Sequence, residues 1–248
     1  MAASRLRIVT YNIQVLAQGD SGVIDTLSRL APDLVGLQEV DQGTARSQGR
    51  SQAKVLAEAL GMQYAYAAAM PYDGGEFGIA ILSRGAITDV RIERLPRGGH
   101  EEPRVALLAT CHLEGGLTLR FANTHLASDW HTQNPQQVRA LQATALAQVL
   151  KAEAELHHTP LFLVGDFNAD SASQAIASLR SVARPLHVDL PTYPATAPAE
   201  ALDHVYYVPA ASSDPYLVEV LSAQTEPSTA SDHVPLCVEV EITEPGSR

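Results

Sequence analysis

The sequence predicts an α/β fold of the α+β kind, in which two mixed β-sheets pack face to face with helices on the outside. The order of the predicted elements is strand, helix, strand, helix, then a run of short β-like segments, then helix, strand, helix and three strands. This order is not the strict alternation of a single parallel sheet, and two sheets with outer helices accommodate it. Hydrophobic residues make up 46% of the 248 residues, which is enough for a substantial core. The length fits one large layered unit, and we expect a single domain over residues 1–248.

The first part of the chain predicts two strand and helix pairs. Apolar stretches at 6–12 and 34–39 are predicted strands that end in Asn12 and Glu39. Helical spacing over 23–30 predicts a helix, with Asp20 or Ser21 as its cap and Pro32 as its stop. A second helix is predicted over 51–60, where Gly61 is well placed to end it.

The middle of the chain predicts an antiparallel meander, because glycines separate four short β-like runs at 77–82, 87–95, 105–112 and 117–123. A long helix follows over about 135–156, with Asn134 as its cap and Pro135 at its first position. The remaining predicted elements are a strand at 161–164, a helix over about 172–179, and strands at 201–208, 216–221 and 234–242.

Composition narrows the class of partner. The net charge is −11 and no run of basic residues is present, so the chain as a whole repels a nucleic-acid backbone. Cys111 and Cys237 both lie in predicted strands; we expect two buried free thiols, with a disulfide as the alternative. The first apolar alternation begins at Leu6, which leaves no room for a signal peptide, and no apolar run reaches the ~20 residues of a membrane span. We therefore expect a cytoplasmic protein, although a trimmed sequence would look the same.

Polar side chains that end or directly follow apolar strands are the candidate functional residues: Asn12, Glu39, Asp166, Asn168 and Asp232. Side chains at the same end of adjacent strands converge, and Mg²⁺ prefers oxygen ligands, usually one or two carboxylates with water and substrate phosphate. Glu39 is the strongest ligand candidate, because it is the acid that ends an apolar strand in the first half of the chain. The alternative for Glu39 is an ordinary solvated acid at the start of a loop.

Histidines supply the second part of the candidate site. His125 ends the predicted strand before it, where a structural role is the alternative. His233 follows Asp232, and an imidazole becomes useful at a phosphate when a carboxylate holds its ring and favours its charged form. Asp203, inside an apolar strand, is the candidate for that carboxylate; a structural pair with an arginine is its alternative. The sequence holds no His-Glu-x-x-His, Cys-x-x-Cys, Gly-rich phosphate loop or Gly-x-Ser-x-Gly, which argues against zinc proteases, P-loop enzymes and serine hydrolases.

Seven segments in this order resemble the endonuclease/exonuclease/phosphatase superfamily, which has the fold of pancreatic-type deoxyribonuclease. They span most of the chain: 9–13 (VTYNI), 33–40 (DLVGLQEV), 77–84 (FGIAILSR), 123–126 (NTHL), 165–168 (GDFN), 202–205 (LDHV) and 231–236 (SDHVPL). The resemblance implies a four-layer sandwich and metal-dependent hydrolysis of phosphodiesters or phosphomonoesters. The segments 77–84 and 201–205 are most similar to those of the small bacterial hydrolases of the superfamily.

The resemblance also implies roles for individual residues. Glu39 is expected to bind Mg²⁺ (or Mn²⁺) with Asn12 beside it, and Asp232 to contact metal or water. Asp166 is expected to orient or deprotonate the attacking water, and Asn168 and His125 to bind phosphate. His233, oriented by Asp203, is expected to face the scissile phosphate. Whether Asp166 or His233 is the general base stays open, as does the number of metal ions.

The chain departs from the nuclease branch of the superfamily. The apurinic endonucleases carry an acid two residues after the first Asn, where this chain has Gln14, and the basic loops of duplex nucleases are missing. A small or lipid-like phosphoester is therefore the preferred substrate class; a DNA or RNA nuclease, or a non-catalytic phosphoester-binding protein, are the alternatives. Single residues in loops near the motifs are the candidates for substrate binding: Arg46, Arg50, Tyr72, Arg104 and Trp130 with His131.

Overall fold

The computed structural model describes residues 3–99, 102–130, 132–210 and 214–243, which form two six-stranded sheets. The first sheet has the order β11-β12-β1-β2-β4-β3, and the second has the order β5-β6-β7-β8-β10-β9. β1 pairs with β2 and β7 with β8 in parallel, and the other pairs are antiparallel, so both sheets are mixed as predicted.

The strands of the first sheet are β1 (Ala3–Asn12), β2 (Leu34–Gln42), β3 (Gln63–Tyr72), β4 (Gly75–Ser83), β11 (Leu217–Thr225) and β12 (Leu236–Thr243). Those of the second sheet are β5 (Ala86–Arg94), β6 (Val105–His112), β7 (Thr118–His125), β8 (Leu161–Asp166), β9 (Arg184–Pro185) and β10 (Asp203–Val208). The helices are α1 (Asp20–Leu30), α2 (Gln52–Leu60), α3 (Pro135–His157) and α4 (Gln174–Arg180), with short 3₁₀ turns at Gln14–Leu16 and Glu114–Gly116.

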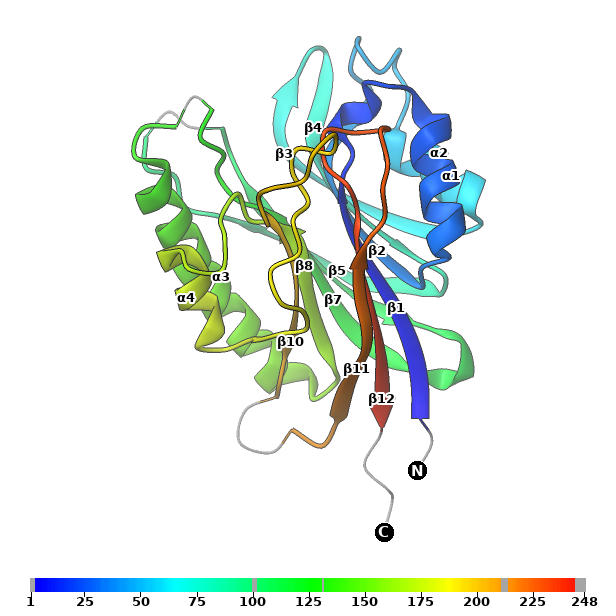
Figure 1. The fold of residues 1–248 in the computed structure, drawn as a ribbon, viewed down its shortest axis with the longest axis vertical. Coiled ribbons are helices and arrows are strands. Elements are labelled where there is room, and N and C mark those ends of the chain that lie inside the picture. The colour runs from blue at the N-terminus through cyan, green and yellow to red at the C-terminus, as the bar shows by residue number, and fades with distance from the viewer. Residues whose placement is uncertain (1–2, 100–101, 131, 211–213, 244–248) are drawn as a thin grey trace.

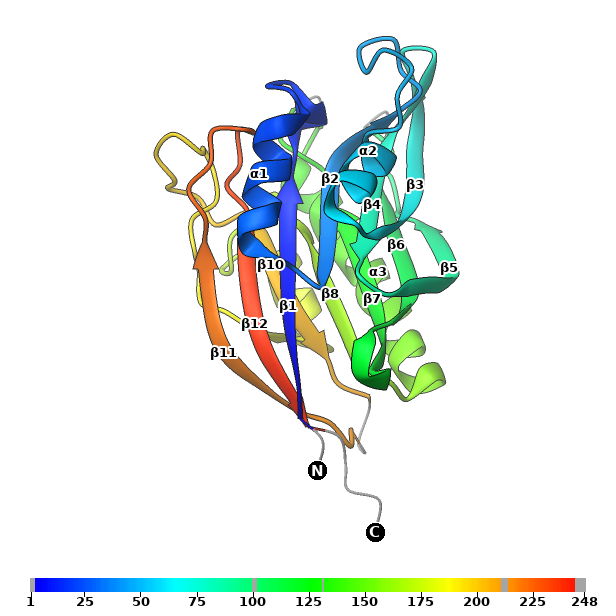
Figure 2. The ribbon, with the colours of Figure 1, turned by 90° about the vertical axis from the view of Figure 1, so that its right-hand side faces the viewer.

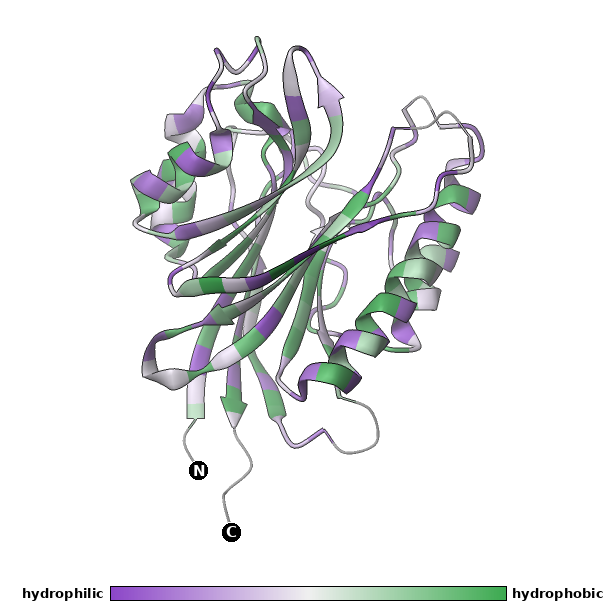
Figure 3. Cartoon of the chain, turned by 180° about the vertical axis from the view of Figure 1, so that it is seen from behind, coloured by the Kyte–Doolittle hydropathy of each residue, from purple (hydrophilic) through white to green (hydrophobic). Residues whose placement is uncertain are grey.

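The elements stack in four layers, with α1 and α2 outside the first sheet and α3 and α4 outside the second (Figures 1 and 2). Alternation along β1 shows how the layers form. Leu6 and Ile8 point into the core between the sheets, whereas Val9 and Tyr11 pack under α1 and α2. A third apolar cluster lies between the second sheet and α3 with α4. The apolar segments accordingly run along the strands and the inner faces of the helices (Figure 3).

The two sheets meet closely beneath the edge where β1, β2, β7 and β8 end. A Cβ on Gly36 would lie 2.3 Å from Cγ2 of Val164, so a side chain there would push the sheets apart. Beside it, the buried Gln38 donates from Nε2 to Asn123 Oδ1 at 2.7 Å, and Asn123 donates to the carbonyls of Leu37 and Ala80. This saturated polar bridge holds the two sheets in one register below the functional edge.

The predicted meander was wrong in one respect. β5, β6 and β7 are consecutive antiparallel neighbours, but β4 lies in the other sheet between β2 and β3. β3 itself was not predicted, because its sequence QYAYAAAMPY is rich in alanine and does not read as a strand. It forms an edge strand whose alternating burial follows the sheet rather than its own propensity.

Two smaller expectations are settled by the structure. Cys111 and Cys237 are both buried and free. Among the described residues, no helix is long and apolar enough to cross a membrane.

Candidate functional site

Strand register brings the predicted site residues together at one edge of the two sheets. Parallel pairing sets Asn12 opposite Gln38, next to Glu39, and His125 opposite Asp166. β10 runs antiparallel to β8, so Asp203 at its start lies opposite Asp166 at the end of β8. β12 runs antiparallel to β1, so Asp232 and His233, just before β12, come next to the end of β1.

Glu39 reaches the site through an irregularity in β2. The pairing of β2 with β4 shifts between Leu37 and Val40, and Glu39 has a φ of 55°, which is uncommon for a residue other than glycine. The bulge lets Gln38 point into the inter-sheet bridge while Glu39 turns to Asn12. Backbone strain of this kind persists where the surrounding structure fixes it and is concentrated at functional sites.

Asn12 joins the acids of the two sheets. Its Nδ2 donates to Glu39 Oε1 at 2.9 Å and to Asp166 Oδ2 at 3.0 Å, and its Oδ1 accepts from the Gln14 backbone N–H at 3.0 Å. Asn12 is therefore fixed by three hydrogen bonds and holds one carboxylate from each sheet within reach of the same point.

His233 lies between two carboxylates. Its Nδ1 is 2.8 Å from Asp203 Oδ2 and its Nε2 is 3.7 Å from Asp166 Oδ2. The Ser231 hydroxyl accepts from the His233 backbone N–H at 3.3 Å and donates to the Asn12 carbonyl at 2.7 Å, which ties the loop before β12 to the end of β1. The predicted pairing of His233 with Asp203 is thus what the structure contains.

His125 has different neighbours. Its Nδ1 is 3.0 Å from Arg104 Nη1, and its Nε2 is 3.1 Å from Asn168 Nδ2 and 3.5 Å from Asp166 Oδ2. The backbone N–H of Asn168 donates to Asp166 Oδ1 at 2.9 Å, and Asn168 has a φ of 48°. His125, Asn168 and Asp166 therefore form one contiguous cluster with His233 on its other side.

The pKa shifts at the site follow from burial and from these partners. Burial raises the pKa of Asp166 to about 6, against the opposing effect of His233, and burial also raises the pKa of Glu39. Burial alone would lower the pKa of His233, but Asp203 and Asp166 raise it to about 10. Burial lowers the pKa of His125 well below its usual value, and the nearby Arg104 charge lowers it further. Two histidines of one site are thus driven toward opposite charge states.

A cavity of about 680 Å³ opens over this cluster. Arg46, Tyr72, Arg104 and Trp130 all line it, together with the predicted catalytic and metal-binding residues except Asp203, which lies behind His233. Arg50 does not line it and instead pairs with Asp20 at 2.9 Å. His131 lies outside the described residues.

The wall at Arg46 is held rigidly. Arg46 donates from Nε and Nη2 to the two oxygens of the buried Asp41, at 2.6 and 2.9 Å, and its guanidinium lies 4.2 Å from the Tyr72 ring centroid. Trp130, which also lines the cavity, is 78% exposed. The cavity therefore presents a preorganised guanidinium beside the ring of Tyr72.

The sequence did not single out several residues that the structure places at the site. Tyr193 packs on His233 with ring centroids 5.0 Å apart and lines the cavity, in the loop predicted at 191–200. Three acids in connecting segments also line the cavity: Glu102, Asp129 and Glu200. No local signal marks these residues, because they lie in connecting segments whose position depends on the packing of the whole fold.

The donor set fits a hard divalent cation. Glu39 and Asp232 have no cationic side chain within ion-pair distance among the described residues, although Glu39 is half-buried. Asp203 Oδ1 is buried without a hydrogen-bond partner, and the ligand atoms of Asp166, Asp203 and His233 lie within 4.8 Å of one another. Buried carboxylates that lack counter-charges are costly, and carboxylate and amide oxygens are the ligands that Mg²⁺ and Mn²⁺ prefer. A buried group of acids and histidine at this edge can hold a metal ion.

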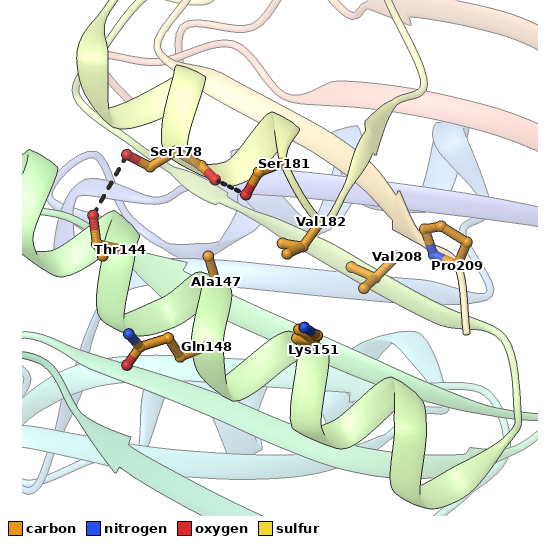
Figure 4. A pocket seen from close by; sticks show the side chains of 9 residues that line it. All are labelled: Thr144, Ala147, Gln148, Lys151, Ser178, Ser181, Val182, Val208 and Pro209. Atoms are coloured by element: carbon orange, nitrogen blue, oxygen red, sulfur yellow. Dashed lines mark hydrogen bonds between the residues drawn. The ribbon is translucent and has the colours of Figure 1, made fainter. Parts of the chain in front are cut away.

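A second hollow, between α3 and α4, has a volume of about 620 Å³ but different chemistry (Figure 4). Its lining consists of aliphatic, hydroxyl and amide side chains with one charged residue, Lys151. Its lining holds none of the carboxylates and imidazoles that gather in the cavity at the sheet edge.

Comparison with known proteins bears on the family of the chain. The sequence profile of the Endonuclease/Exonuclease/phosphatase family matches residues 9–233. The chain finds no match among curated protein sequences.

Similar solved structures cover almost the whole chain. A family protein from Bacteroides thetaiotaomicron is 19% identical, with a TM-score of 0.74, over 97% of this chain and 96% of that one. The catalytic domain of human Nocturnin with bound sulfate is 20% identical, with a TM-score of 0.72, over 96% and 95% of the two chains. The mannosyl-6-phosphatase of B. thetaiotaomicron is 21% identical, with a TM-score of 0.71, over 95% and 99%. The family profile spans nearly all of the elements that build the sheet edge, and the chain belongs to the endonuclease/exonuclease/phosphatase family.

Proposed function

We propose that this chain is a divalent-metal-dependent phosphoesterase that hydrolyses a small or lipid-like phosphoester. The observation that carries the proposal is the pair of hydrogen bonds from Asn12 to Glu39 and Asp166, which unites an oxygen-rich cation site with two histidines in one cavity. Family membership supports hydrolysis of a phosphoester bond, and the oxygen donors of Glu39, Asn12 and Asp232 in the cavity support the metal.

Glu39, Asn12 and Asp232 would hold Mg²⁺ or Mn²⁺. When bound, the ion would neutralise charge on the phosphate, which otherwise repels an attacking oxygen. The arginines that line the cavity are already engaged: Arg46 by Asp41 through Nε and Nη2, and Arg104 by His125 through Nη1.

Asp166 is the proposed base. Both nitrogens of His233 face carboxylates, so that ring is held as a cation and is not available to accept a proton. Asp166 takes the proton of a water whose oxygen bonds to phosphorus as the bond from phosphorus to the alcohol oxygen breaks. His233 donates a hydrogen bond to the phosphoryl group, and Asp203 orients its ring.

Asn168 and His125 would bind the remaining phosphoryl oxygens. Both lie within 3.5 Å of an Asp166 oxygen or of each other, so an oxygen bound by them would also be close to the base. Hydrogen-bond donors that are already fixed in place before the reaction stabilise the charge that develops in the transition state.

The walls of the cavity favour a small substrate over nucleic acid. Glu102, Asp129 and Glu200 line it, and the net charge of the chain is −11, so a polyanion would meet repulsion at the mouth of the site and beyond. Tyr72 and Trp130 offer apolar surface to an ester group, and Arg46 and Arg104 offer positive charge to the phosphate.

The test is turnover of bis-p-nitrophenyl phosphate and p-nitrophenyl phosphate with Mg²⁺ or Mn²⁺, with and without chelator. We expect metal-dependent release of nitrophenol, abolished by chelator and reduced ~10²–10³-fold in Asp166→Asn. Glu58→Gln, which changes an exposed acid on α2, is the matched control and keeps full activity. Equal rates for wild type and Asp166→Asn would refute catalysis at this site. Preferential cleavage of DNA or RNA in a substrate panel would replace the small phosphoester with a nucleic acid.

A further inference from the structure

Arg104 places a hydrogen-bond donor against one nitrogen of His125. The arginine is only 4% exposed, and its Nη1 lies 3.0 Å from His125 Nδ1. A guanidinium carries five N–H donors, has no acceptor, and does not lose its proton in proteins. The Nδ1 atom that faces it must therefore present a lone pair.

The other nitrogen of His125 also faces a donor. A neutral imidazole has only one acceptor nitrogen, so it can accept a hydrogen bond from only one of these two donors. Nε2 lies 3.1 Å from Asn168 Nδ2 and 3.5 Å from Asp166 Oδ2. Asn168 Nδ2 has another acceptor, the Leu126 carbonyl at 3.2 Å. Hydrogen bonds from a charged donor are roughly twice as strong as neutral ones, so the bond from Arg104 prevails.

We propose that Arg104 is a positioning residue that locks His125 in the neutral tautomer with its proton on Nε2, directed toward the reacting centre. In this structure the carboxylate oxygen nearest to that nitrogen is Asp166 Oδ2, at 3.5 Å. In the working enzyme the Nε2–H group donates to a phosphoryl oxygen without transferring its proton, because Nδ1 has no acceptor that would stabilise a second one. The donation to a phosphoryl oxygen rests on the proposed phosphoesterase function, whereas the tautomer of His125 does not.

The inference sets the two histidines of the site apart. His233 Nδ1 faces the Asp203 carboxylate, which favours a charged ring, and His125 Nδ1 faces a guanidinium, which forbids one. One histidine therefore supplies positive charge and the other a neutral donor. A substrate phosphate would meet a single imidazolium, with the rest of its counter-charge left to the metal and the arginines.

The tautomer can be read directly by two-bond ¹H–¹⁵N correlation of ¹⁵N-histidine-labelled full-length protein at pH 7, with and without Mg²⁺. His125 is assigned by its absence in His125→Gln. We expect an unprotonated Nδ1 and a protonated Nε2 in the wild type, in Arg104→Lys and in Arg46→Met, the last being a matched loss of an arginine from the same cavity. In Arg104→Glu we expect the ring proton to move to Nδ1, because the new carboxylate would accept a hydrogen bond from an Nδ1–H group. A wild-type His125 protonated on Nδ1, or on both nitrogens, would overturn the proposal.

Kinetics separate positioning from mere folding. Arg104→Glu should lower kcat on the order of 10²-fold, with Arg104→Lys restoring it to within about threefold of wild type. If Arg104→Glu does not fold, Arg104→Met should show mixed His125 tautomers and an intermediate kcat. Unchanged kcat in a folded Arg104→Glu would end the positioning role. A wild type that shows the expected tautomer but turns over no phosphoester would instead contradict the proposed function alone.

Discussion

Two of the clusters of buried charge in the described part of the chain are built on opposite plans. Between the second sheet and α3, Arg120 and Glu153 are both about 2% exposed at the side chain and are 2.5 Å apart. Arg91 also contacts Glu153 at 2.5 Å, and Arg120 contacts Asp89 at 2.8 Å. Every charge in this cluster has a partner of opposite sign.

At the sheet edge the balance is different. Glu39, Asp166, Asp203 and Asp232 share one cavity or lie directly behind it, and His233 is the cation nearest to most of them. The comparison teaches that buried charge alone does not mark a functional site. An excess of one sign does, because natural selection keeps a costly imbalance only where a ligand or metal completes it.

The largest expected effect is on catalysis, in Glu39→Gln. The amide keeps an oxygen for the Asn12 N–H but removes the charge, so kcat/KM with Mg²⁺ should fall ~10³-fold. Because burial raises the pKa of Glu39, its charged form is disfavoured in the fold, and thermal unfolding should show equal or greater stability for the variant. If Glu39→Gln lowered both the melting temperature and kcat/KM, Glu39 would stabilise the fold, as the Arg120–Glu153 pair does.

The paired cluster should respond in the reverse way. Arg120→Met leaves the buried Glu153 with Arg91 as its main partner and should cost about 3 kcal/mol in the free energy of unfolding, measured with urea. The specific activity of the folded variant should equal that of the wild type, because neither Arg120 nor Glu153 lines the cavity.

A double variant sharpens the same point. In Arg120→Met with Glu153→Leu no buried charge of this cluster is left unpaired, because the remaining Asp89 and Arg91 side chains are exposed, and most of the lost stability should return. If the double variant were instead as unstable as the sum of the two single changes, the cluster would not act as a pair.

The sequence predicted the acids at the sheet edge as candidates but gave no sign of the paired cluster around Arg120 and Glu153. Asn12, Glu39 and Asp166 were candidates because each ends a predicted apolar strand, and the ends of neighbouring parallel strands converge at one edge of a sheet. Asp203 and Asp232 lie instead at or before the start of β10 and β12, and only the packing of the two sheets brings Asn12 and Asp166 together. Arg120 and Glu153 are separated by 33 positions on a strand and a helix, with nothing local to join them. The bulge at Glu39 and the loop carrying Tyr193 were equally out of reach, since both depend on how distant segments pack.

The placement of single cations was the weakest part for the same reason. Arg46, Arg50 and Arg104 look alike in the sequence, each a lone arginine near a motif. Only the fold shows that Asp41 fixes the first, Asp20 draws the second away and His125 meets the third. Long flexible side chains take their direction from tertiary partners, and this is where a motif stops being informative.

A third way to bury a titratable group is to keep it neutral, and the stacked pair His187 and His204 does this, with ring centroids 5.5 Å apart. Burial lowers the pKa of both rings, that of His204 to about 4. His187 also accepts the Val205 backbone N–H on Nε2, which leaves that nitrogen no room for a proton.

The smallest predicted effect follows from this pair. Below the ordinary histidine pKa of about 6.5 the unfolded chain binds protons that the folded chain refuses, so stability falls as the pH falls toward 4. Between pH 6.5 and pH 5 the contribution of His204 to this loss should be about 2 kcal/mol. His204→Gln keeps a donor for the Ala169 carbonyl but does not titrate, so urea unfolding across this range should give a flatter dependence of stability on pH than in the wild type. Parallel curves for the two proteins would mean that the folded chain accommodates a charged ring at this position, and burial there would not select the neutral form.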